Sequence, residues 1–185
     1  MTALRTARLV LRRARADDLE AMHAILSDPR ATTYWSHGPH ENLDRTRAWL
    51  DSMIDAPPDL SDDFVITLGG RAIGKLGAWR LPEIGFILAP EHWRRGYAAE
   101  AMAAFLDHVF ARPDVAGLTA DVDPRNRASL ALLARHGFAE TGRAAGTWET
   151  HIGRCDSIYF RLDAEDWRSR RKATDRETKA PFQSK

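Results

Sequence analysis

The residues best suited to chemistry lie in one turn, Arg94–Arg95–Gly96–Tyr97–Ala98–Ala99. An apolar run typical of a strand ends shortly before this turn, and a long amphipathic helical pattern begins within it. The first turn of a helix has backbone N–H groups without partners and a partial positive charge, so it attracts anions. Gly96 lets the backbone approach a phosphate closely, Ala98 is small, and the two arginines add cationic donors. The turn therefore predicts a phosphate-binding site.

Two widespread phosphate-binding motifs do not fit this turn. No Gly-Lys-Ser/Thr follows it, as a Walker loop requires. The dinucleotide fingerprint needs three spaced glycines, and the turn has one. On residue types alone, an ordinary helix start with solvated arginines stays open as the alternative.

Before the turn, the pattern predicts a strand, two helices and three strands. Leu9 and Leu11 alternate within a strand at 6–13, and the acids at 17 and 18 start a helix with apolar positions three and four residues apart. A second helix is expected at about 43–54. The runs 64–68 and 72–79 flank Gly69-Gly70, which is typical of a hairpin, and 83–89 forms the third strand of an antiparallel set.

After the turn, the apolar spacing predicts a helix from Ala98 to Phe110, then a strand at 118–122 and a helix at 126–135 that Gly137 closes. The run 157–162 reads as a late strand. This order predicts one α/β domain over residues 5–165, with a mixed, mostly antiparallel central sheet and helices on both faces. The charged tail at 168–185 is expected to be mobile or disordered.

Composition excludes several classes of protein. The chain has 27 basic and 26 acidic residues, a net charge of +1, which argues against bulk nucleic-acid binding. No run approaches the roughly 20 apolar residues of a membrane span, so a cytoplasmic protein is expected. The single cysteine, Cys155, allows no internal disulfide and is expected to be a buried structural thiol. The seven histidines show no metal-binding spacing, so no metal is expected.

Three motifs in order resemble the GNAT acetyltransferases, in particular the branch that includes the ribosomal-protein N-terminal acetyltransferases. Trp93-Arg-Arg-Gly96-Tyr-Ala98 matches the last two fixed positions of the family's phosphate motif Gln/Arg-x-x-Gly-x-Gly/Ala, with Trp93 at the first. The segment Asn126-Arg-Ala-Ser129, with Gly137-Phe138 and Gly142, looks like the family's Asn-x-x-Ser…Gly-Phe…Gly segment. The opening 6–13 with its following acids is also typical of this branch.

The resemblance implies acetyl-CoA as cosubstrate and direct attack of an amine on its thioester. By resemblance, Arg94 to Ala99 hold the pyrophosphate, and the strand from Glu83 lies along the pantetheine. A backbone N–H near Phe86, Ile87 and Leu88 would bind the thioester oxygen at a splay between the central strands. Glu83 is the first candidate for the general base, with a solvated strand-end glutamate as the alternative.

Further roles follow only from the resemblance. Glu149 is a second candidate base, since its segment borders the amine site in this branch. The tyrosine that protonates the thiolate in many members is absent, because Leu132-Leu133 stand in that neighbourhood. Ser129 matches a serine that relatives use for this step or for a cofactor hydrogen bond, with a serine on the helix surface as the alternative. Asn126 is expected to contact pantetheine or to cap its helix. The aromatic and histidine-bearing loop 33–40 forms one wall of the amine site in the family.

The sequence thus predicts an N-acetyltransferase for a small amine, an amino acid or a protein N-terminus. An acyl-CoA-binding sensor without catalysis is the alternative from another class. A nucleotide-binding domain that uses the same turn is weaker, because no acidic metal site follows a strand. The identity of the amine is not readable, and exposed strand edges leave a homodimer open.

Overall fold

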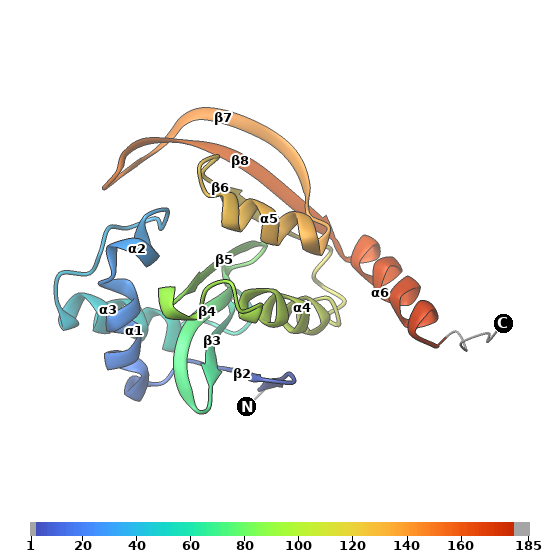
Figure 1. Cartoon of the computed structure of the whole chain (residues 1–185), viewed down its shortest axis with the longest axis horizontal. Helices are drawn as coiled ribbons and strands as arrows, with labels where there is room; N and C mark the ends of the chain where they lie inside the picture. Colours follow the sequence, from blue (N-terminus) through green and yellow to red (C-terminus); the bar gives the residue numbers. More distant parts are fainter. Residues whose placement is uncertain (1–2, 180–185) are drawn as a thin grey trace.

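The computed structural model describes residues 3–179, and in it one curved sheet runs through the whole molecule (Figure 1). The eight strands are β1 (Leu4–Arg5), β2 (Leu9–Arg12), β3 (Asp62–Leu68), β4 (Arg71–Arg80), β5 (Glu83–Leu88), β6 (Gly117–Val122), β7 (Ala139–Thr150) and β8 (Gly153–Asp163). Their order in the sheet is β1-β2-β3-β4-β5-β6-β8-β7, and every pairing is antiparallel except β5 with β6. The predicted mixed, mostly antiparallel sheet is confirmed.

Helices cover both faces of this sheet. They are α1 (Leu19–Leu26), α2 (Pro29–Thr32), α3 (Leu43–Ile54), α4 (Tyr97–Val109), α5 (Arg127–His136) and α6 (Ala164–Lys179). The larger core lies between the sheet and α4, where Phe105 and Leu106 are fully buried against Ile66 of β3. On the other face, Met22 of α1 packs against Val65, which neighbours Ile66 and so points the opposite way.

The hairpin of β3 and β4 turns at Gly69 and Gly70, as predicted. Both glycines have positive φ, +58° and +86°, a region that glycine enters without steric cost. In the ladder that follows, Val65 pairs with Lys75. This register places the side chains of Val65 and Lys75 on the same face of the sheet.

The sheet separates between β5 and β6. The two strands pair only at Glu83 and Thr119 in the register, supported by the hydrogen bond from the Thr119 N–H to the Pro82 carbonyl at 2.9 Å. Beyond this point the two strands diverge. The backbone groups of β5 on the side that faces β6 therefore have no ladder hydrogen bonds to that strand. A splay between the central strands was expected from the resemblance, and the structure has one here.

The short elements β1 and α2 were not predicted, and two longer segments also differ from the prediction. β7 was not predicted, because its Gly and Ala residues give little strand signal and most of its side chains are exposed. The segment from Arg168, expected to be mobile or disordered, continues helix α6 as far as Lys179. Its start is anchored by Trp167, which is buried and donates its indole N–H to Asp107 at 3.0 Å, and its Arg, Lys and Glu residues are good helix formers. Residues 180–185 of the expected tail lie outside the described residues.

Candidate active site

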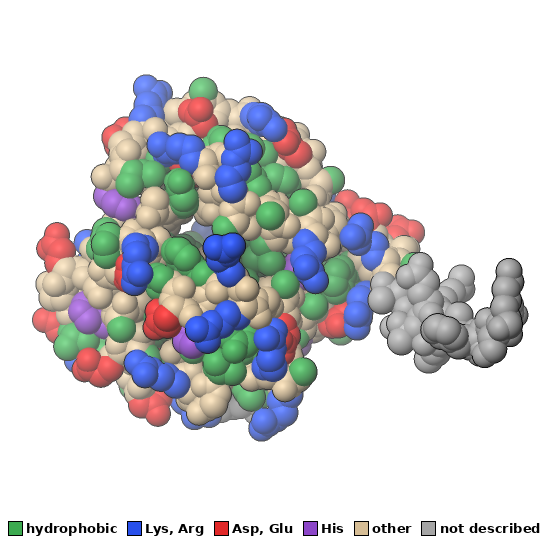
Figure 2. Space-filling view, viewed as in Figure 1, with side chains coloured by type: hydrophobic (Ala, Val, Ile, Leu, Met, Phe, Trp, Pro, Cys, Tyr) green, Lys and Arg blue, Asp and Glu red, His purple; other side chains and the backbone are tan. Residues whose placement is uncertain are grey.

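A cavity of about 930 Å³ lies where the sheet separates. Its walls come from the loop after α2, from α3, from the β4–β5 turn, from β6 with the start of α5, and from the β7–β8 hairpin. In the space-filling view, the surface is hollowed between the part with α1–α3 and the part with β7 and β8 (Figure 2). Segments far apart in the sequence therefore meet around one space.

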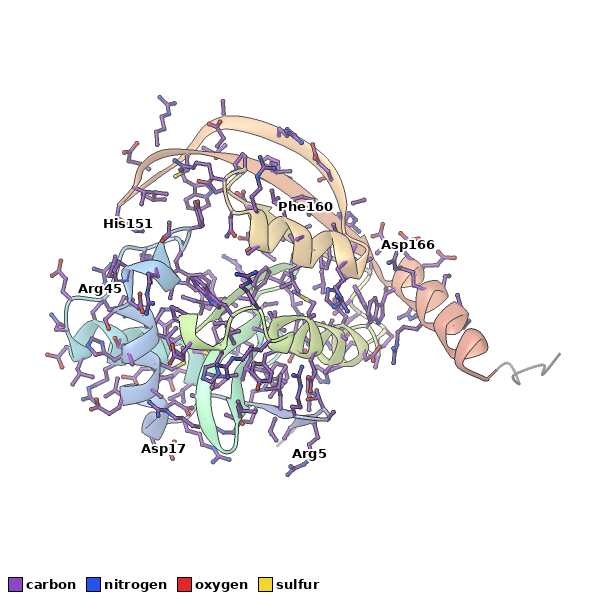
Figure 3. All side chains as sticks on the ribbon, viewed as in Figure 1. Arg5, Asp17, Arg45, His151, Phe160 and Asp166 are labelled. Carbon is purple, nitrogen blue, oxygen red and sulfur yellow. The ribbon has the colours of Figure 1, made fainter. Side chains whose placement is uncertain are left out.

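The tip of the β7–β8 hairpin reaches the loop after α2. Figure 3 shows His151 at this tip, above α2. A Cβ at Gly38 would lie 3.1 Å from the His151 Cβ, so the hairpin and the loop are in contact. Tyr34, Trp35 and His37 of this loop line the cavity, as expected for the wall of an amine site, whereas His40 is buried beside Thr46.

The turn before α4 has the geometry of an anion cradle. Gly96 is the N-cap of α4 with a φ of +80°, and it supplies no side chain to cap the helix. The N–H groups of Tyr97, Ala98 and Ala99 in the first helical turn thus have no intrahelical partner. Arg94 also has a positive φ, +58°, which is uncommon outside glycine and costs energy. Arg94, Arg95 and Gly96 are exposed, so a phosphate could reach them.

Arg8 holds this turn in place from β2's flank. Its guanidinium donates to the Arg95 carbonyl at 3.0 Å and to Glu100 at 2.7 Å, and it lies 4.5 Å from the centre of the Tyr97 ring. Burial raises the pKa of Glu100, but hydrogen bonds from Thr6 and Arg8 outweigh it and lower that pKa. Glu100 therefore stays ionised, and its ion pair with Arg8 ties the start of α4 to the N-terminal strand.

The residues around the turn fit a pyrophosphate. A Cβ at Gly96 would lie 3.4 Å from Arg8 Nη2, so a side chain there would contact the arginine that holds the turn. Close by, the buried Nδ1 of His92 has no hydrogen-bond partner among the described residues. The Trp93 indole N–H binds the Leu88 carbonyl at 2.7 Å, which fixes the end of β5 to the turn. Phe86 of the same strand lines the cavity, so β5 connects the turn with the cavity.

Glu83 lies where β5 and β6 begin to separate. It is exposed, lines the cavity, and lies opposite Thr119 in the register. Because side chains alternate along a strand, Glu83 and Gly85 share the face of Ile87, which packs with α1. No salt bridge is recorded for Glu83 among the described residues, so its carboxylate is available to a ligand.

Asn126 and Ser129 lie on the opposite wall, at the start of α5, and both line the cavity. The Asn126 side chain accepts a hydrogen bond from the Ser129 N–H at 3.1 Å. Of the two roles expected for Asn126, helix capping is therefore present in the structure. The Ser129 hydroxyl has no recorded partner among the described residues and remains a candidate to contact a cofactor.

Besides the six residues of the turn at 94–99, three candidate residues do not line the cavity. Glu149 is exposed on β7 between Trp148 and Thr150, which line the cavity, so alternation points Glu149 to the other face. Ile87 and Leu88 are buried and do not line the cavity. Their backbone still lies along the open edge of β5, where an N–H that binds the thioester oxygen, as expected from the resemblance, would have to lie.

Several lining residues were not predicted. Trp79 is 61% exposed at the end of β4, and Trp148 stands on β7. The Trp148 indole N–H donates to Asp121 of β6 at 2.9 Å, which fixes the ring in the cavity wall. Lys75 and Asp63 form a buried ion pair in the wall made by β3 and β4. A lysine inside the apolar run 72–79 was a signal that could have revealed this pair.

Cys155 is a buried free thiol, as expected, and also lines the cavity. Within residues 3–179, no cluster of three or more His, Cys, Asp or Glu side chains could hold a metal ion. In that same part of the chain, no helix is long and apolar enough to cross a membrane.

Comparisons with known proteins agree on one family. Residues 8–139 match the sequence model described as "Acetyltransferase (GNAT) domain". The "Uncharacterized N-acetyltransferase p20" of Bacillus licheniformis is 28% identical over 175 residues, which cover 86% of this chain and 94% of that protein.

Two solved structures are similar in fold. One is the spermidine N-acetyltransferase from Vibrio cholerae in complex with CoA and spermine, with a TM-score of 0.76, 21% identity, and 88% of this chain and 99% of that chain covered. The other is RimL, the ribosomal L7/L12 alpha-N-protein acetyltransferase, in complex with coenzyme A. Its TM-score is 0.80 at 17% identity, and 89% of this chain and 99% of that chain are covered.

Proposed function

The chain belongs to the GNAT acetyltransferase family, and on that premise we propose that it transfers the acetyl group of acetyl-CoA to a primary amine. Membership of this family makes it an acyltransferase enzyme. The observation that carries the proposal is the glycine-capped turn before α4, joined by β5 to a cavity at the split of the sheet. We assign this activity to a single domain, residues 5–165.

Acetyl-CoA supplies an acetyl thioester, which is activated toward amines. The backbone N–H groups from Gly96 to Ala99 would hold its pyrophosphate, with Arg94 and Arg95 as cationic donors. The open edge of β5 at 86–88 would face the pantetheine and donate an N–H to the thioester oxygen. Ser129, at the start of α5, would contact the cofactor from the opposite wall of the cavity.

The reaction joins the amine nitrogen to the acetyl carbon while the carbon–sulfur bond breaks. The amine loses a proton and the departing thiolate gains one. Glu83 is our candidate for the base, directly or through a water, because it lines the cavity and its carboxylate has no ion-pair partner within residues 3–179. Ser129 is the candidate to donate to the sulfur. Glu149, on the outer face of β7, would act only if that hairpin changed its conformation.

The charge of the cavity favours an amine that arrives protonated. Five carboxylates and two cations line it: Asp63, Glu83, Asp121, Asp123, Asp156, Lys75 and Arg80. An excess of negative charge raises the local concentration of cations. Of the two similar structures, one is a spermidine N-acetyltransferase in complex with CoA and spermine, and the other is a ribosomal L7/L12 alpha-N-protein acetyltransferase. For this chain, a small amine, an amino acid and a protein N-terminus are all candidates.

The test is release of free thiol from acetyl-CoA in the presence of a panel of small amines, amino acids and N-terminal peptides. The proposal predicts release that depends on an amine and falls strongly in Glu83→Gln. The matched control is Glu20→Gln, an exposed carboxylate on α1 outside the cavity, which should retain full activity. Acetyl-CoA binding without turnover of any amine would contradict the proposal.

A further inference from the structure

A buried ion pair lies in the cavity wall formed by β3 and β4. Lys75 Nζ is 2.8 Å from Asp63 Oδ2 and 3.1 Å from Asp63 Oδ1. The side chains are only 4% and 3% exposed, and both line the cavity. They project from the face of the sheet that α1 covers, the face that also carries Glu83 and Gly85.

This pair is not explained by stability. Burying two charges costs desolvation energy that their attraction only partly returns, and apolar replacements of buried pairs are often neutral or stabilising. Apolar residues such as Val65 and Met53 surround this part of the sheet, so an apolar pair would pack here. The other buried acid of β3, Asp62, binds Arg13 and His108 instead and does not line the cavity.

The wall beside the pair offers hydrogen-bond donors without partners. An ammonium has three N–H donors, and the bonds recorded for Lys75 within the described residues go to the two oxygens of Asp63 alone. Trp35 lies next to it, with its ring centre 5.7 Å from Nζ, and its buried indole N–H has no partner in the described part of the chain. Gly85 leaves room: a Cβ there would lie 4.0 Å from Nζ and 3.7 Å from the Trp35 ring.

We propose that Lys75 and Trp35 form a subsite for a neutral carbonyl oxygen of the amine substrate, with Asp63 holding Lys75 in position. The inference rests on the proposed acetyl transfer and specifies the class of amine. Both groups are pure donors, which suits a carbonyl oxygen, a pure acceptor. A free carboxylate is disfavoured by the surrounding acids, whereas the amide carbonyl of an α-amino amide or peptide N-terminus carries no charge.

The experiment compares three amines: an α-amino amide, the alkylamine of the same size in which an uncharged alkyl group replaces the carboxamide, and the free α-amino acid. The wild-type enzyme should favour the amide over the other two by roughly tenfold to a hundredfold in kcat/KM, the range of a hydrogen bond to a charged group. Turnover of all three at similar kcat/KM overturns the subsite and leaves the transferase intact. No thiol release with any amine overturns both.

Variants test which side chains cause the preference for the amide. The double variant Lys75→Met with Asp63→Asn removes both charges without leaving one buried alone, and it should reduce the preference for the amide to about twofold or less. Trp35→Phe keeps the ring, removes the N–H, and should reduce the preference in part. Arg80→Met, the other cation of the cavity, should leave the ratio unchanged. A ratio that survives in Trp35→Phe and in the double variant overturns the assignment. If the double variant does not fold, the wild-type ratio and Trp35→Phe decide.

Discussion

Replacing Gly96 with alanine tests the turn before α4 by adding a single carbon. Gly96 has a φ of +80°, where an alanine is strained by about 1–2 kcal/mol. Alanine therefore either destabilises the fold by that amount or rotates the turn, which moves the open N–H groups of α4. Gly70, in the β3–β4 turn, is the matched control, because its φ is +86° and a Cβ there would meet no atom within 4 Å.

The two variants are compared by urea unfolding and by calorimetric titration with acetyl-CoA. The free energy of unfolding should fall by about 1–2 kcal/mol in both variants. Only Gly96→Ala should weaken acetyl-CoA binding, by about tenfold or more, which corresponds to about 1.4 kcal/mol. If Gly96→Ala binds acetyl-CoA as tightly as Gly70→Ala does, the turn is not the phosphate cradle and the reasoning fails.

Three further predictions concern Arg8, Asp62 and His40. Arg8→Ala should weaken acetyl-CoA binding by about threefold to tenfold in calorimetry, because the Arg95 carbonyl loses its 3.0 Å donor; unchanged binding would deny Arg8 a positioning role. Asp62→Ala should lower the unfolding free energy by about 3 kcal/mol in urea, since the buried carboxylate binds Arg13; a loss below about 1 kcal/mol would contradict this. Burial, the largest cause, lowers the pKa of His40 from 6.5 to about 4. The unfolded chain then binds the proton more tightly than the folded one. The free energy of unfolding should therefore fall by about 3 kcal/mol as the pH is lowered from 6.5 to 4. In His40→Asn, the plot of unfolding free energy against pH should be flatter in this range.

The sequence predicted the elements whose signals are local. Helix α3 has the expected bounds, Leu43–Ile54, because its apolar spacing and its Asn42 cap act within the helix. The β3–β4 hairpin likewise depends on its two glycines. Strand β7 was missed because its exposed Gly and Ala residues carry little preference, and pairing with β8 decides its conformation.

The same distinction holds for the site. The turn at 94–99 is continuous in sequence, so it could be proposed as a phosphate site before the fold was known. The Trp148–Asp121 contact and the Lys75–Asp63 pair join different strands, and only the strand order and register bring them together. The direction of Glu149 also depends on the alternation of a strand that was not predicted.

The most direct test of the central claim follows both products of the reaction in one experiment. Acetyl-CoA carrying a labelled acetyl group is incubated with the enzyme and an amine, and released thiol and labelled amine are measured together. Acetyl transfer predicts one mole of acetylated amine for each mole of thiol, and no thiol release without the amine. Thiol release without labelled amine would make the protein a thioester hydrolase, and absence of both products with every amine of the panel would contradict the proposed function.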